Sequence, residues 1–380
     1  MRLPALLLSL ALAACGPASR ESFTLGEQLA AVVPGIPDAR AWGDAGPTAL
    51  APLGMTPEQI AERRPGDLDY LALSSGGPAG AYSAGLLVGW TEAGTRPEFD
   101  VVTGVSSGAL LAPFAFVGPE ADAALREVWA GGAAQELGRN LNFFGLLNGQ
   151  GIVDPEPLSD LLEAYVNDDL VAAIAQGHRE GRRLLVVTTN LDAQRPVIWN
   201  LGAIAASGQP GAAALIREIL LASSSVPVAF APVLIDTLAG SRWIQEMHVD
   251  GGVSSQIFAL PDAALSDGSL FEVPRGRDAT MWLLVNYVLG PEFLVTPGGS
   301  VGVGQRAYGS LIKSDVRSEL YAILDASEEA GIDARVDSIP DTVPWDPRDP
   351  FSPAFMQRLY DLGRAAALTG EAFQNGAGRS

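Results

Sequence analysis

Thiols and imidazoles are almost absent from this sequence. It contains one cysteine, Cys15, and two histidines, His178 and His248. A single thiol excludes an intramolecular disulfide and a thiolate metal site, and acylation of Cys15 would also exclude a cysteine nucleophile. Two histidines far apart in the chain are too few for a clustered metal centre. We therefore predict no metal and no cofactor.

Positive charge is also scarce. Lysine and arginine total 24 against 44 acidic residues, which gives a formal net charge of -20 at pH 7. This charge repels phosphate groups, so nucleic acid is a poor candidate partner and anionic lipid headgroups are disfavoured. Hydrophobic residues make up 48% of the chain and charged residues 18%, a composition that favours a large folded core over disorder.

The N-terminus is typical of a secretion signal. Arg2 precedes an unbroken apolar run, and small residues then lead to Cys15. The apolar run is too short to cross a bilayer as a mature helix. Residues 12–15, Leu-Ala-Ala-Cys, resemble the bacterial lipobox, which implies cleavage after residue 14 and lipidation of Cys15; an ordinary signal peptide is the alternative. Gly16 stands where an aspartate marks inner-membrane retention, so this analogy favours an outer-membrane lipoprotein facing the periplasm.

Apolar strands alternate with helices through most of the chain. We predict strands at 69–74, 99–103, 184–192, 243–250 and 281–289, helices at 81–90, 109–117, 306–331 and 354–368, and a helix leading through prolines to a strand at 217–233. Such alternation favours a parallel or mixed sheet covered on both faces. Residues 16–66, rich in Pro, Gly and Ala, are predicted to form a tether and loosely structured packing, and residues 340–353 a surface connection.

The clearest chemical motif lies between a predicted strand and a predicted helix. Gly104-Val105-Ser106-Ser107-Gly108 fits G-x-S-x-G, in which small neighbours let the serine project from a strained turn. The helix that follows directs backbone N–H groups and its positive dipole end at the same place. On its own the motif is weak in a chain with 43 glycines, where a plain glycine turn is the alternative.

Two further glycine motifs accompany this serine. Ser75-Gly76-Gly77-Pro78-Ala79-Gly80 follows the strand at 69–74, and its adjacent glycines let backbone N–H groups converge on a developing oxyanion. It lacks the spacing of phosphate-binding loops, which leaves a simple turn as the alternative. Asp250-Gly251-Gly252 places a carboxylate at a strand end, although D-G-G alone is more often a loop.

Together and in this order, the three motifs resemble those of patatin-like phospholipases over residues 67–252. TTNLD at 188–192 and ASSSVPVAFAPV at 222–233 add to the similarity. The resemblance implies a three-layer α/β fold, with a mixed, mostly parallel sheet and helices on both faces. It divides the chain into a signal peptide (1–14), a lipidated tether and N-terminal segment (15–66), a catalytic core (67–260) and a C-terminal part that completes or flanks the core (261–380).

The resemblance also implies a Ser/Asp dyad. Ser106 is the expected nucleophile, Asp250 its base, and the backbone N–H groups of Gly76, Gly77 and Ser107 the expected oxyanion donors. A carboxylate is a poor base in water, but burial raises its basicity. The expected activity is that of a carboxylic ester hydrolase, a phospholipase A or lysophospholipase that forms an acyl-serine and acts on lipid esters at the membrane that holds its anchor.

The oxyanion loop departs from the family pattern G-G-G-x-[RK]-G. Ser75 replaces the first glycine and Ala79 the basic residue. The backbone donors survive these changes, so we expect either weaker oxyanion stabilisation or a different way of holding the loop.

Two other functions stay open at this point. A conventional α/β-hydrolase triad would have to combine Ser106 with Asp192 and His248, since no histidine follows Asp250. His248 lies two residues before Asp250, so both side chains point to the same face of a strand. A purely structural role for His248 is the alternative. His178 is expected in an exposed polar turn. A lipoprotein scaffold with a decayed site is the remaining hypothesis; substrate specificity and oligomeric state are not predicted.

Overall fold

The computed structural model describes residues 20–132, 153–296, 298–343 and 351–374. Cys15 and the signal segment lie outside these residues, as does part of the proline-rich connection at 340–353. Within the described ranges, no helix combines the length and apolar character needed to cross a bilayer.

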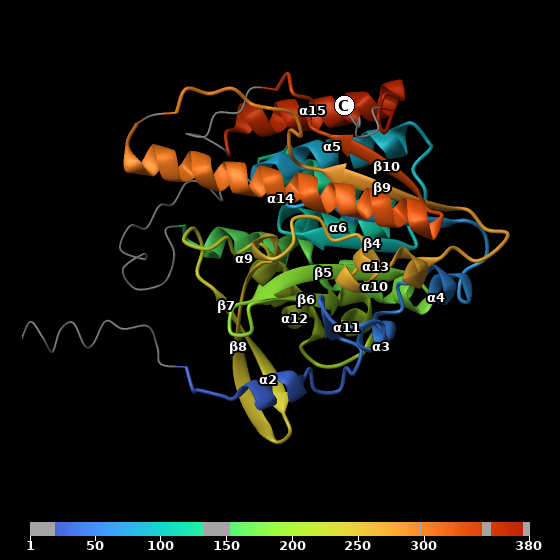
Figure 1. Ribbon diagram of the computed structural model, residues 1–380, viewed down its shortest axis with the longest axis vertical. Helices are drawn as coiled ribbons and strands as arrows, with labels where there is room; N and C mark the ends of the chain where they lie inside the picture. The colour runs from blue at the N-terminus through green and yellow to red at the C-terminus, as the bar shows by residue number, and fades with distance from the viewer. Residues whose placement is uncertain (1–19, 133–152, 297, 344–350, 375–380) are drawn as a thin grey trace, which may run out of the picture.

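A mixed sheet runs through the middle of the molecule (Figure 1). Followed from one hydrogen-bonded neighbour to the next, its strands are β1 (Ala31–Val32), β7 (Val233–Ala239), β8 (Arg242–Asp250), β5 (Arg183–Asn190), β4 (Val101–Val105), β3 (Leu68–Leu73), β9 (Ala279–Val285) and β10 (Asp333–Ser338), while β6 (Arg195–Asn200) pairs with β5 and with β2 (Arg40–Trp42). Strands β5, β4, β3, β9 and β10 are parallel, and the other pairings are antiparallel.

Helices cover both faces of this sheet. One face carries α5 (Gly80–Glu92), α6 (Ser107–Val117), α7 (Asp122–Trp129), α9 (Glu156–Tyr165), α10 (Asp168–Arg179), α11 (Leu201–Ala206), α12 (Ala212–Ser223) and α15 (Pro353–Thr369). The other carries α3 (Pro47–Leu50), α4 (Pro57–Ala61), α13 (Asp262–Ser266) and α14 (Ser300–Ala330). The short helix α2 (Leu25–Ala30) contacts β7, and 3-10 turns are η1 (Ala51–Leu53), η2 (Gly77–Ala79), η3 (Pro119–Ala121), η5 (Gly251–Val253) and η6 (Gly268–Phe271).

Burial on both faces explains why the central strands are continuous apolar runs. Along β5, Leu184 and Val186 belong to the core on one side of the sheet, and Leu185 and Val187 to the core on the other. Each strand residue therefore needs an apolar side chain, whichever face it points to. The predicted three-layer α/β fold with a mixed, mostly parallel sheet is confirmed.

Three local expectations are corrected. Strand β4 continues to Val105, so the first two residues of the G-x-S-x-G motif belong to the strand rather than to the turn. His178 lies in the last turn of α10 and is half-buried. The helix continues to Arg179, and the chain turns away at Gly181, whose φ is +100°. The segment before residue 66 is more ordered than expected, since Arg40–Trp42 and Ala31–Val32 both join the sheet.

Candidate active site

Ser106 sits on a strained turn between β4 and α6. Its φ is +54°, a region that side chains rarely adopt. The flanking glycines are required sterically: a Cβ on Gly104 would lie 2.4 Å from the carbonyl oxygen of Gly108, and one on Gly108 would lie 2.2 Å from that of Leu73. The two motif glycines therefore allow the turn, and the turn presents the serine at the carboxyl edge of the sheet.

The strand register brings Asp250 to this serine. Strand β6 occupies one edge of β5, so β4 and β8 must share the other edge. Val105, the last residue of β4, pairs with Val187, and Asp250, the last residue of β8, pairs with the next residue, Thr188. The two strands thus meet end to end, and Ser106 leaves the sheet where Asp250 arrives.

The side chains of these two residues are hydrogen-bonded. Ser106 Oγ donates to Asp250 Oδ2 at 2.6 Å, and the N–H of Gly252 donates to Asp250 Oδ1 at 2.7 Å. Burial raises the pKa of Asp250 to about 7, although both hydrogen bonds act to lower it. A serine hydroxyl is therefore held against a carboxylate whose pKa suits proton transfer near neutrality.

The serine run that begins with the last residue of α12 fixes the backbone on both sides of the pair. Ser223 Oγ accepts from the N–H of Ser106 at 3.1 Å and donates to the carbonyl of Val187 at 2.7 Å. The N–H of Asp250 donates to the carbonyl of Ser225 at 3.0 Å. These hydrogen bonds give the segment at 222–233 a concrete role in holding nucleophile and acid in register.

The glycine loop after β3 faces the same place. Gly76 has φ +154° and lies so close to Asn286 that a Cβ would fall 2.4 Å from the Cβ of that residue, whereas a Cβ on Gly77 would meet nothing within 4 Å. No hydrogen bond within the described ranges uses the N–H groups of Gly76, Gly77 or Ser107. These N–H groups are free to bind an oxyanion.

The loop is held by neutral side chains instead of a basic one. Asn286 Nδ2 donates to the carbonyl of Ser74 at 3.0 Å, and the N–H of Ser75 donates to the carbonyl of Gln256 at 2.9 Å. The Ser75 hydroxyl also donates to the Gln256 side chain, and Ala79 is buried. Ser75 thus takes part in a new connection between the oxyanion loop and the segment that follows Asp250.

Gln256 and Asn286 were not identified from the sequence. Gln256 Nε2 donates to the carbonyl of Gly252, so one side chain contacts both the oxyanion loop and the loop after the acid. Asn286 follows β9, the parallel neighbour of β3, and its polar side chain within the apolar run predicted as a strand at 281–289 was the available signal for it. No comparable pattern marks Gln256.

His248 and Asp192 are hydrogen-bonded to groups other than Ser106. His248 Nε2 donates to Glu246 at 3.2 Å, which leaves Nδ1 to accept from the Thr188 hydroxyl at 2.9 Å. Asp192 accepts from Arg20 at 2.7 Å and from the N–H of Met247 at 3.0 Å. Neither side chain forms a hydrogen bond to the serine or to the other, so the structure does not assemble the triad.

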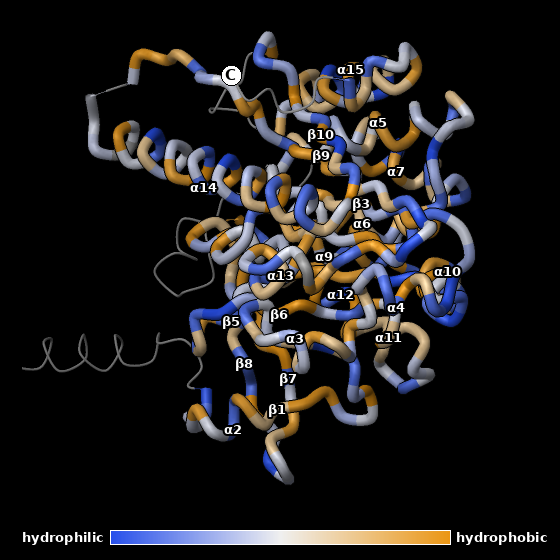
Figure 2. The backbone as a smooth tube through the Cα atoms, turned by 45° about the vertical axis from the view of Figure 1, so that its right-hand side comes forward, coloured by the Kyte–Doolittle hydropathy of each residue, from blue (hydrophilic) through white to orange (hydrophobic). Residues whose placement is uncertain are grey.

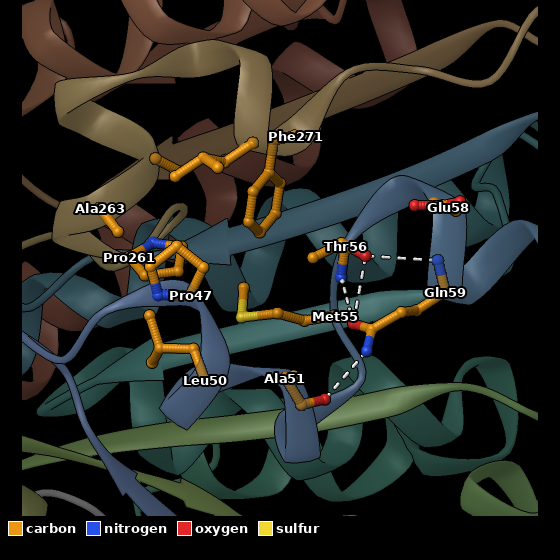
Figure 3. A pocket seen from close by; sticks show the side chains of 12 residues that line it. Pro47, Leu50, Ala51, Met55, Thr56, Glu58, Gln59, Pro261, Ala263 and Phe271 are labelled. Atoms are coloured by element: carbon orange, nitrogen blue, oxygen red, sulfur yellow. Dashed lines mark hydrogen bonds between the residues drawn. The ribbon is translucent and has the colours of Figure 1, made fainter.

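A separate apolar pocket lies on the α3 and α4 side of the molecule (Figure 3). It has a volume of about 200 Å³ and is lined by residues that include Leu50, Met55, Pro261 and Phe271. Two of its polar side chains are used locally, because Thr56 and Gln59 cap α4 reciprocally. Neither member of the serine–aspartate pair lines it, and across the described ranges no group of acidic, histidine or cysteine residues could hold a metal ion.

A serine on a strand-to-helix turn, paired with a buried carboxylate beside free backbone N–H groups, is the arrangement of an acyl hydrolase. The family model for patatin-like phospholipases matches residues 71–262, which include all three motifs, and the chain belongs to this family. The family match makes it a lipid hydrolase in general terms. No curated protein matches the sequence.

Among solved structures, VipD from Legionella pneumophila is similar, with a TM-score of 0.38 and 11% sequence identity. The similarity covers 81% of this chain and 68% of that chain.

Proposed function

We propose that this protein hydrolyses carboxylic esters of lipids through an acyl-serine intermediate, with Ser106 as nucleophile and Asp250 as base. The observation that carries the proposal is the 2.6 Å hydrogen bond between the strained serine and the buried aspartate. The alternative triad has no such contact, because His248 and Asp192 are engaged elsewhere.

The proposed reaction has two halves. Ser106 Oγ attacks the ester carbonyl as its proton passes to Asp250 Oδ2, and the N–H groups of Gly76, Gly77 and Ser107 stabilise the oxyanion. Collapse of the tetrahedral intermediate breaks the ester C–O bond, and the alkoxide leaves with the proton from Asp250. Water then attacks the acyl-serine with the same base, which releases the fatty acid and restores the serine.

Family membership supports lipid esters as the substrates, and the expected subclass is a phospholipase A or lysophospholipase. We further propose that Cys15 is lipidated and anchors the protein in the bacterial outer membrane, facing the periplasm. The lipobox residues 12–15 support this assignment. Palmitate labelling and membrane fractionation test it: wild type should carry label and Cys15→Ser should not, whereas equal labelling of the two would contradict it.

A fluorophosphonate probe tests the serine directly. We expect wild type to be labelled and Ser106→Ala to be unlabelled. Ser107→Ala is the matched control, because its hydroxyl is buried without a hydrogen-bond partner in the described part of the chain and its backbone N–H is retained. A folded wild type without label would favour the scaffold hypothesis, and a screen of phospholipids, lysophospholipids, triglycerides and p-nitrophenyl esters would define the substrate.

A further inference from the structure

One projecting part of the molecule carries a group of exposed apolar side chains. This part, here called the arm, comprises residues 290–296 and the first turns of α14, residues 300–311. Phe293 is 94% exposed, Val295 78% and Leu311 69%, and Val303 and Tyr308 are also exposed. Single exposed apolar residues are ordinary, but a group of large ones within one short segment marks an interaction site.

The loop of the arm is fixed to its helix. Lys313 Nζ donates to the carbonyl of Gly290 at 2.8 Å and forms an ion pair with Glu292, and Arg306 donates to the carbonyl of Glu292. These bonds hold the loop against one side of α14 and place Phe293 directly beyond the last bonded residue. The apolar side chains are thus presented on a braced support.

The arm rises from the same edge of the sheet as the candidate active site. It begins five residues after β9 ends at Val285, and β9 is separated from β4 only by β3. Further along α14, Glu319 accepts from the N–H groups of Gln256 and Ile257 at 2.8 and 2.7 Å. Figures 1 and 2 both show the N-terminal end of α14 extending beyond the sheet.

The arm and the site are connected through α14. Burial, and after it the negative charge of Asp250, raise the pKa of Tyr308. Tyr308 and Leu311 lie on the same helix as Glu319, whose bonds to the N–H groups of Gln256 and Ile257 tie α14 to the segment that follows Asp250.

Charge identifies the kind of surface that the arm fits. Residues 293–305 contain no charged side chain, in a chain whose formal net charge is -20. An anionic membrane or a nucleic acid would be repelled by the chain as a whole and would find no cationic cluster among these residues. An uncharged or zwitterionic lipid surface fits both properties.

The N-terminal end of the chain is tied to the same edge. Arg20 donates to Asp192, which lies two residues beyond the end of β5. Only four residues lie between Arg20 and Cys15, which makes five residue steps and a span of at most about 17 Å. An acyl anchor at Cys15 would therefore hold the carboxyl edge of the sheet near the membrane, with the arm on that side.

We propose that the arm inserts its exposed apolar side chains into a zwitterionic lipid surface and so places the Ser106 site against the membrane. The biological purpose of this membrane binding rests on the proposed function. Binding by the arm is nevertheless a physical property that is measured without any reaction.

The test is sedimentation with vesicles of ether-linked phosphatidylcholine, which contain no carboxylic ester. The full chain is used with Cys15→Ser, so that no acyl anchor contributes. We expect Phe293→Ser/Val295→Ser to weaken vesicle binding by about tenfold or more, since both apolar side chains leave the lipid interface. The kcat/KM of this variant for soluble p-nitrophenyl butyrate should stay within about twofold of the parent value, which is about the precision of such assays.

Leu368→Ser is the matched control. Leu368 is 43% exposed in the last turn of α15, and α15 runs beside α5 with Arg364 paired to Glu92, at the far end of α5 from the oxyanion loop. This control should bind vesicles like the parent. Equal binding by the arm variant, an equal loss in Leu368→Ser, or binding that requires anionic phosphatidylglycerol would overturn the proposal.

Measurement of the molecular mass in solution tests the other possible partner of the arm, which is a second copy of the chain. If the arm variant changed the protein from a dimer to a monomer, the arm would be an interface between copies and the proposal would be wrong. A parent protein that binds vesicles but hydrolyses no ester would contradict the proposed function, but it would not contradict membrane binding by the arm.

Discussion

Strand β8 carries two buried acids that experience opposite environments. Burial acts to raise the pKa of Glu246, but hydrogen bonds from His248 and Arg40 and the charge of Arg40 hold that pKa at about 2. Asp250, four residues further on, is buried with no cation beside it in the described part of the chain, and its pKa rises to about 7. The same strand thus holds one acid as a permanent anion and the other as a group that exchanges a proton near neutrality.

The difference shows how the molecule separates stability from chemistry. Glu246, with its lowered pKa, stabilises the fold above its unfolded pKa near 4.5, and this contribution is lost only as the pH falls through about 2. Asp250, with its raised pKa, favours the fold below its unfolded value near 3.8, and this contribution is lost as the pH rises through about 7. At neutral pH the first acid supports the fold and the second works against it.

Removing the charge of Asp250 should have the largest effect. Asp250→Asn keeps the shape and can still accept from the N–H of Gly252, but it cannot take the serine proton, so kcat/KM should fall by about three orders of magnitude or more. Because the buried anion is gone, the free energy of unfolding at pH 8 should rise by up to about 4 kcal/mol. Ester hydrolysis and urea unfolding measure the two quantities; an active variant would remove Asp250 from the chemistry.

Blocking the oxyanion loop should have the next largest effect. The open space beside Gly77, whose φ is +56°, would receive a branched side chain in Gly77→Val, where the backbone and the substrate oxygen must meet. We expect turnover to fall by about two to three orders of magnitude with the fold retained. Turnover near that of wild type in a variant with normal circular dichroism would reduce the loop to a simple turn.

The acid limb of the pH profile reports the environment of Asp250. Since its carboxylate must be ionised to act as a base, kcat/KM should fall about tenfold per pH unit below a pKa of about 7, or about a hundredfold at pH 5. A soluble ester and circular dichroism at each pH separate titration from unfolding. A profile that stays flat from pH 5 to 8 would contradict an essential base with this pKa.

The converse change is predicted to affect stability and to spare activity. Glu246→Gln leaves the guanidinium of Arg40 nearly buried beside a neutral amide, which should lower the free energy of unfolding by about 3–5 kcal/mol. Because neither group contacts Ser106, kcat/KM of the folded variant should stay within about threefold of that of wild type. Urea unfolding paired with ester kinetics tests this, and a folded but inactive variant would connect the network to the chemistry.

The sequence was most informative where local rules decide the structure. Continuous apolar runs marked β3, β4, β5 and β9 because both faces of the sheet are covered, and G-x-S-x-G marked its turn because the close approaches of Gly104 and Gly108 admit no side chain. Family motifs then pointed to Asp250, and the register of β4 and β8 gives the physical reason that it meets the serine.

The remaining features depend on contacts between distant segments. Gln256, Asn286 and Ser223 connect loops that only the folded sheet brings together, and one polar residue in a loop has no periodic pattern by which to be found. His178 was placed in an exposed turn because its polar neighbours resemble a loop, yet α10 continues through it. The exposed arm was also unmarked, since its apolar residues resemble those of a buried segment.

The smallest expected effects decide between the dyad and the triad. His248→Gln and Asp192→Asn should each retain kcat/KM within about threefold of wild type on p-nitrophenyl butyrate, because neither side chain bonds to Ser106. A loss of about 1–2 kcal/mol in stability is expected for His248→Gln, which breaks the buried hydrogen bond to Thr188. Under the triad the pattern inverts, since neutral imidazole would be the essential base and Asp192 its orienting group. Circular dichroism confirms folding in each case, and an inactive His248→Gln beside an active Asp250→Asn would establish the triad and overturn the assignment of both acids on β8.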